Sequence, residues 1–131
     1  MTWTAILGLY LVFRLKQLAG DYLLQTKWMA LTKGSLSREG WKALATHAGI
    51  HAALTFAILL VVAPSLWALA LVDFATHAAV DRLKGRLVNL KGWTPSNWQF
   101  WWAFGIDQEV HNLTHLAYLI MIVAAAGGIS P

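Results

Sequence analysis

Asp107-Gln-Glu-Val-His111-Asn-Leu-Thr-His115 opens the last hydrophobic segment of the chain. Its aspartate and two histidines follow one another at steps of four residues. Residues four apart stack on one face of an α-helix. The segment is therefore expected to be a helix with one polar stripe along an otherwise apolar surface.

The same step of four residues recurs earlier in the sequence. Asp73, His77 and Asp81 form a second stripe, and His47 and His51 form a third. All five histidines and all four aspartates of the chain lie within apolar, helix-like stretches. Ionisable side chains in such places need partners, a water-filled cavity or a bound ion. We interpret the stripes as parts of one polar site.

The composition is that of an integral membrane protein. The chain has 131 residues, which is room for one domain, and 58% of them are hydrophobic while only 12% are charged. Soluble domains carry about twice that share of charged residues. There is no cysteine, so a disulfide framework and a thiolate metal site are both excluded.

Four segments alternate with polar linkers. The pattern predicts an all-α, four-helix transmembrane bundle over residues 1–131, with helices at about 3–30, 37–63, 65–87 and 95–126. Each segment is long enough to cross a hydrocarbon core of about 30 Å. The polar stripes of all four segments fall near the ends that face the two linkers. They should therefore meet at one depth in the membrane and form a single intramembrane Asp/His cluster.

The basic residues indicate topology and not nucleic-acid binding, in spite of a net charge of +4. They gather around the two linkers: Lys27, Lys33, Arg38 and Lys42 at the first, and Arg82, Lys84, Arg86 and Lys91 at the second. The positive-inside rule then places both linkers in the cytoplasm and both termini outside. Membrane lipids are the expected surroundings, and a homo-oligomer stays open.

A divalent transition metal is the simplest reason for so many buried imidazoles and carboxylates. Both ligand types suit zinc, manganese or iron, and the number of candidates allows one or two ions. The predicted ligands are His47, His51, Asp73, His77, Asp107, His111 and His115. Two alternatives remain: a structural network of ion pairs without metal, and a haem bound by two histidines.

The leading functional hypothesis is a metal-dependent hydrolase of an ester or phosphoester near the cytoplasmic leaflet. Its substrate would be a lipid or another amphiphile that enters from the membrane, and Asp81 or Asp21 would act as general base. Lys16 is expected at the membrane interface, or paired with Asp21 or a substrate phosphate. The alternative is a non-catalytic metal-binding protein, either a carrier of divalent ions or a membrane partner module.

The motifs also resemble those of a known family. The matching pieces are residues 20–26 (Gly-Asp-Tyr-Leu-Leu-Gln-Thr), His47-x3-His51, Asp73-x3-His77-x3-Asp81 and Asp107-Gln108-x2-His111. They resemble motifs of small membrane proteins of bacteria and phages with no known function. That family is loosely akin to membrane proteins described as metal-dependent hydrolases. The resemblance implies the bacterial inner membrane as location. The family pattern often has a histidine where Lys16 and Gln17 stand here.

Overall fold

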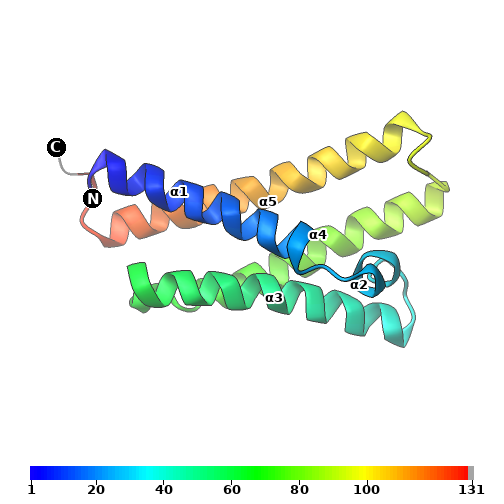
Figure 1. Ribbon diagram of the computed structural model, residues 1–131, viewed down its shortest axis with the longest axis horizontal. Helices are drawn as coiled ribbons and strands as arrows, with labels where there is room; N and C mark the ends of the chain where they lie inside the picture. Colours follow the sequence, from blue (N-terminus) through cyan, green and yellow to red (C-terminus); the bar gives the residue numbers. More distant parts are fainter. Residues whose placement is uncertain (130–131) are drawn as a thin grey trace.

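A computed structural model describes residues 1–129 of the protein (Figure 1). These residues form helices and no β-strand, which confirms the all-α class. The elements in chain order are α1 (Trp3–Leu18), η1 (Ala19–Leu23), α2 (Lys27–Thr32), α3 (Arg38–Val62), η2 (Pro64–Leu66), α4 (Leu69–Lys91) and α5 (Trp98–Ala125). Ser130 and Pro131, at the terminus predicted to be external, lie outside the described residues.

The predicted single helix over residues 3–30 is wrong, because the segment breaks after its first half. α1 widens into the π-helical turn η1, in which the Leu24 amide donates to the Ala19 carbonyl five residues back. The chain then leaves the helix, and α2 starts afresh where the Thr26 side chain accepts from the Met29 amide. π-Turns are frequent at functional sites. This one carries Asp21 into the bundle interior.

The other three long helices lie close to the predicted segments, and local residues explain where they begin and end. Ser37 caps the first turn of α3 by accepting from the Gly40 amide, and Pro64 follows its last residues. α4 runs four residues beyond the predicted 87. It ends only at Gly92, whose φ of 63° is the left-handed conformation that glycine adopts without strain.

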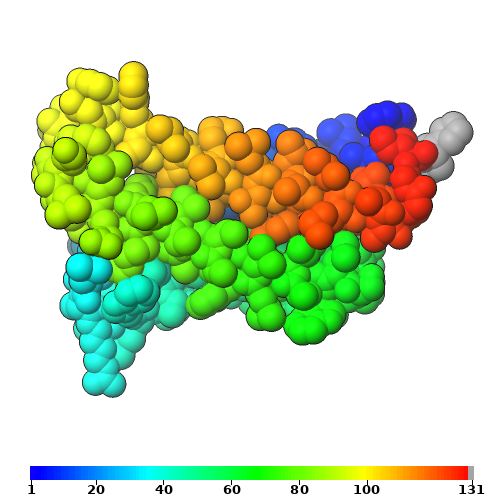
Figure 2. Space-filling view, turned by 180° about the vertical axis from the view of Figure 1, so that it is seen from behind, coloured from blue at the N-terminus to red at the C-terminus, as the bar shows by residue number. Residues whose placement is uncertain are grey.

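The helices pack as an antiparallel bundle with two different ends (Figures 1 and 2). Both polar linkers lie at one end, and the chain termini and the turn at Pro64 lie at the other. The amino group of Met1 donates to the Gly128 carbonyl there, at 2.6 Å. An apolar cluster fills this terminal end, with Phe13, Leu59 and Ile122 almost fully buried.

The prediction of four membrane-crossing helices is not supported by helix length and hydropathy. Among the described helices, α3 alone is long and apolar enough to cross a membrane by these two measures, and one such helix is weak evidence. The physical reason lies in the polar stripes. α1 has only 16 residues because of the π-turn, and the charged side chains of α4 lower the mean hydropathy of that helix.

Candidate metal centre

The middle of the bundle is polar, whereas its terminal end is apolar. The buried polar side chains come from α1, η1, the first linker, α3, α4 and α5: Lys16, Gln17, Asp21, Lys33, His47, His51, Thr55, Asp73, His77, Asp81, Arg82, Asp107, His111 and His115. The four-residue steps in the sequence turn these side chains inward. All nine predicted aspartates and histidines are therefore buried.

Four of them converge on one point, namely Asp21, His47, His51 and His77. Asp21 Oδ1 lies 3.1 Å from His51 Nε2, 3.3 Å from His47 Nε2 and 3.8 Å from His77 Nε2. The His47 and His77 Nε2 atoms are 3.2 Å apart. Ligand atoms about 2.0–2.1 Å from a tetrahedral zinc ion are separated from each other by about 3.3 Å. The group thus has the size and the donors of a three-histidine, one-carboxylate site.

One buried nitrogen atom of the first group, His51 Nε2, supports this assignment. His51 Nε2 and His111 Nε2 make no hydrogen bond, although both are shielded from solvent. His51 Nε2 lies close to Asp21 but without hydrogen-bond geometry, as two ligands of one ion would. Buried polar atoms without a partner are rare and call for a specific cause. The unpaired His51 Nε2 therefore fits a divalent ion in the first group, whose residues could hold one.

A second group adjoins the first and shares a histidine with it. It consists of His77, Asp81 and His111, with Asp81 Oδ2 3.8 Å from His77 Nε2 and Asp81 Oδ1 3.9 Å from His111 Nε2. Asp81 Oδ2 is also 3.3 Å from His47 Nε2. The second group is looser and incomplete without His77. The distances therefore fit one ion in the first group, with Asp81 next to that group, better than two ions that share His77.

Two glutamines orient Asp21 towards the histidines. Gln17 and Gln108 donate from their amide nitrogens to Asp21 Oδ2, at 2.7 and 2.8 Å. The other oxygen, Oδ1, is left facing the three imidazoles. Hydrogen bonds to a ligand's distant atom fix its orientation and tune the metal. Gln17, which stands where the family pattern suggests a histidine, thus still supports Asp21.

Three lysines enter the site, and sequence reasoning missed most of them. Lys33 Nζ lies 2.6 Å from Asp81 Oδ2, and Lys84 Nζ lies 2.9 Å from Asp107 Oδ2 and 3.6 Å from Asp81 Oδ1. Sequence reasoning gave these two lysines to topology. A lysine side chain is long enough to reach inward from a linker or helix end, and nothing in its spacing marks this.

Lys16 is not at an interface but among the most buried side chains of α1. Its ammonium group lies 2.8 Å from Asp73 Oδ2 and 2.9 Å from His115 Nε2, and Thr55 donates to the same aspartate oxygen at 2.8 Å. Neither Asp73 nor His115 belongs to the two groups above. A lysine ammonium fills the place in which the sequence analysis expected an ion.

The predicted ligands therefore divide into two sets. The structure brings together His47, His51, His77 and His111, along with the two predicted bases Asp21 and Asp81. It places the other three predicted ligands against lysines: Asp73 and His115 with Lys16, and Asp107 with Lys84. Asp21 lies inside the first group, where it could be a ligand instead of a base.

Neither alternative from the sequence accounts for the first group. The histidine rings stack directly on one another, with centroids 3.7 Å apart for His51 and His77 and 3.9 Å for His77 and His111. No flat macrocycle fits between rings in contact, so neither of these two stacked pairs has the geometry of a bis-histidine haem site. An ion-pair network does describe Asp73 and Asp107, which lysines neutralise. It leaves the orphaned imidazole nitrogens unexplained.

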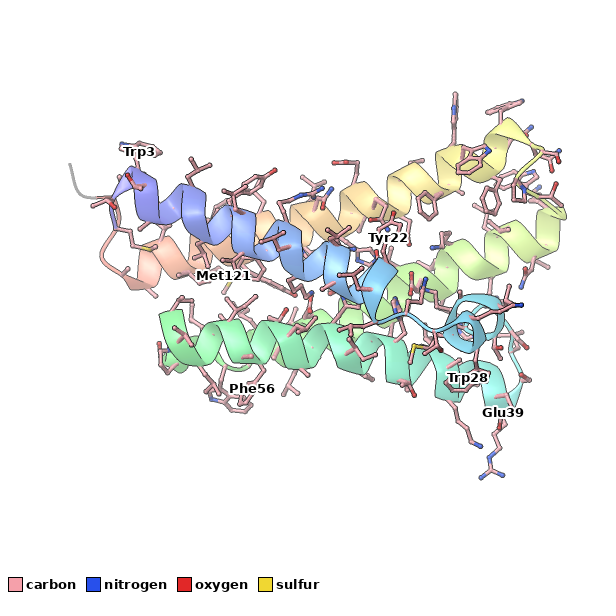
Figure 3. The ribbon with its side chains drawn as sticks, in the orientation of Figure 1. Trp3, Tyr22, Trp28, Glu39, Phe56 and Met121 are labelled. Carbon is pink, nitrogen blue, oxygen red and sulfur yellow. The ribbon has the colours of Figure 1, made fainter. Side chains whose placement is uncertain are left out.

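A cavity of about 360 Å³ adjoins the two groups on the side of the linkers. Asp21 and Asp81 line it together with Lys33 and Lys84, and Phe104 forms part of its apolar wall. The residues that line the cavity belong to η1, α2, the first linker, α4 and α5. The cavity therefore lies between the region after α1 and the pair formed by α4 and α5. Tyr22, which also lines it, is exposed and is labelled at the end of the first segment in Figure 3.

Comparison with known proteins gives a family but no activity. Residues 9–130 match the family model described as "Protein of unknown function (DUF3307)". The chain belongs to the DUF3307 family. Searches of the curated proteins and of the solved structures found no match. This agrees with the resemblance to a family of unknown function, while the kinship to hydrolases and the membrane location receive no support from it.

The contact between Gly20 and His51 predicts how the centre can be disturbed without removing a ligand. A Cβ atom at position 20 would lie 2.3 Å from His51 Cε1, so Gly20→Ala should push the imidazole out of the first group. We expect Gly20→Ala to lose most of its zinc or manganese, measured by elemental analysis after dialysis of the purified protein.

Gly49→Ala is the matched control, because it lies between His47 and His51 on α3 and a Cβ there meets nothing within 4 Å. It should keep its metal and gain about 0.5–1 kcal/mol of stability, the usual gain for alanine over glycine within a helix. Equal metal content in both variants would contradict the role of His51.

Proposed function

We propose that the protein is an integral membrane metalloprotein, and the distribution of side chains carries this proposal. Its interior holds buried lysines, aspartates and histidines, while large apolar side chains such as Leu7, Val61, Leu83, Leu113 and Ile120 are exposed along the long helices. In Figure 3, the labelled Trp3 and Phe56 point outward from the bundle, and Met121 is also exposed. Exposed apolar surface of this extent marks a membrane or a protein interface. A hydrocarbon environment would cover the exposed apolar side chains of α1, α3, α4 and α5 together.

In the proposed topology the linker end faces the cytoplasm. Most of the basic residues gather at this end, as do the exposed Trp98, Trp101 and Trp102 at the start of α5, where aromatic residues suit the membrane interface. His47 follows Lys42 by five residues, or about 8 Å along the helix. The centre would therefore lie below the cytoplasmic head groups, within reach of a lipid.

The topology can be tested with reporter fusions in a bacterial host. Fusions at Gly34 and Gly92, one in each basic linker, should report the cytoplasm, and a fusion after Pro131 should report the outside. The reason is the charge bias of the linkers. A cytoplasmic reading after Pro131 would contradict the proposed orientation, and a fully water-soluble protein would contradict the membrane proposal itself.

We propose hydrolysis of an ester or phosphoester as the activity. A divalent ion in the first group would supply Lewis acidity by taking water or a substrate oxygen as a fifth ligand, which would lower the pKa of that water and polarise the scissile group. The protein's own part is to hold the substrate in the cavity and to move protons. Water would add its oxygen to the carbonyl carbon or the phosphorus, the bond to the alcohol oxygen would break, and the departing alcohol would receive a proton.

Asp81 is the proposed proton acceptor, since it is a carboxylate that lines the cavity and borders the first group without belonging to it. It would take the proton of the attacking water and pass it to the leaving alcohol. Asp21 would act as a ligand in this scheme. The terminal apolar cluster gives the site no polar path across the bundle, which speaks against a carrier made of one chain.

One observation favours a non-catalytic metal-binding protein as the second candidate. Lys33 and Lys84 already bind Asp81, and Lys84 also binds Asp107. Carboxylates that are paired with lysines can have a purely structural role. In that case the ion would tie η1, α3 and α4 together, as structural metal sites do.

The two candidates differ in what Asp81→Asn should do. The substitution keeps the size of the side chain and removes the proton acceptor. Under the hydrolase proposal it should lower turnover by roughly a hundredfold to ten-thousandfold, while metal content stays close to that of the wild type. The melting temperature should fall in either case, because Lys33 loses its carboxylate partner. The assay is metal-dependent release of water-soluble product from mixed bacterial lipids, with Glu109→Gln on the exposed face of α5 as control.

Retained activity in Asp81→Asn would contradict the role of this residue. No metal-dependent release by metal-loaded wild-type protein from any phospholipid or isoprenoid phosphate would leave the non-catalytic candidate standing.

A further inference from the structure

The cavity beside the centre has two kinds of wall. One is charged, with Asp21, Asp81 and Asp107 alternating with Lys33 and Lys84. The other is apolar and includes Leu31, Val88, Phe100 and Phe104. Such a division suits a ligand with a polar head and an apolar neighbouring part. Tyr22 and Leu31, which are exposed, also line the cavity, so apolar and aromatic surface joins it to the outside of the bundle.

The charge of the cavity depends on the metal ion. Three aspartates and two lysines line it, which gives a formal charge of −1 with the histidines neutral. A divalent ion in the first group, of which Asp21 is part, changes the sign to +1. Without the ion the cavity repels anions, and with the ion it attracts them. Opposite charges also interact more strongly here than in water, because the site is largely buried.

The two lysines have donors to spare. An ammonium group donates three hydrogen bonds. Lys33 uses one for Asp81, and Lys84 uses one for Asp107, at 2.9 Å, with Asp81 further away at 3.6 Å. Both lysines line the cavity with the rest of their surface. An anion with several acceptor oxygens could bind both of them at once.

We infer that this cavity binds the phosphate group of an amphiphilic substrate between Lys33 and Lys84, and that it does so only when the metal ion is bound. This rests on the proposed metal site and narrows the substrate from esters in general to phosphate-bearing molecules. A volume of about 360 Å³ is at the lower limit of small-molecule pockets. It suits a small head group, whose apolar remainder passes the phenylalanine wall towards the lipid.

The test measures anion binding apart from catalysis. Titration calorimetry would follow inorganic phosphate, and separately short-chain phosphatidic acid, binding to the detergent-purified protein with and without zinc. We expect both ligands to bind the zinc-loaded protein, and neither to bind after chelation. Short-chain diacylglycerol, which has the ester bonds but no phosphate, should not compete.

Lys84→Gln should weaken binding by roughly tenfold to a hundredfold, the loss of one charge-assisted hydrogen bond. Lys84→Arg, which keeps the charge, should bind more tightly than Lys84→Gln even if its geometry is worse. The matched control is Lys42→Gln, because Lys42 is exposed on α3 and pairs with exposed Glu39, away from the cavity. It should bind like the wild type.

The outcomes separate this inference from the proposal beneath it. Binding of phosphatidic acid alone would support the inference and assign the phosphate to a lipid, and equal binding of inorganic phosphate would support it with a free phosphate as sufficient ligand. Zinc-loaded, folded protein that binds neither ligand would overturn the inference and leave the metal site intact. Failure to hold zinc at all would instead remove the proposed function. Equal binding with and without zinc would overturn the charge argument.

Discussion

The structure depends on neutralising buried charge inside an apolar bundle. Isolated ions in such an interior cost far more free energy than a fold can spare, so each must have a partner. The protein meets this with lysines for Asp73, Asp81 and Asp107. Asp21 receives two amide groups and three imidazoles instead, and a bound cation would complete its neutralisation.

Local backbone features serve this arrangement of charges. The π-turn of η1 ends α1 early and directs Asp21 inward, and Gly20 has no side chain where His51 approaches. Gly34 and Gly85 bring the first linker against α4, since a Cβ at position 85 would lie 2.8 Å from Gly34 Cα. That close approach places Lys33 beside Asp81. The linker thus forms part of the site, although its sequence is that of an ordinary polar loop.

Much of the fold and part of the site could be predicted from the sequence. The four-residue steps of aspartates and histidines predict which helix faces are buried, because the period of the α-helix is near 3.6 residues. They identified His47, His51, His77 and His111 as candidate metal ligands. The steps could not reveal the break at Ala19–Leu23, since a π-turn leaves no mark in a pattern of period four. Nor could they tell which aspartates a lysine would reach, because that depends on the distance between helices and on a long, flexible side chain.

Metal analysis with X-ray absorption spectroscopy tests most directly whether the protein holds one divalent ion between three histidines and one carboxylate. The protein, purified without chelators and loaded with zinc, should hold about one ion per chain with about four nitrogen and oxygen ligands at roughly 2.0–2.1 Å. His77→Ala should lose the ion, and His115→Ala, which removes a partner of Lys16, should keep it. A protein that holds no divalent metal, or that loses it equally in both variants, would contradict the central claim.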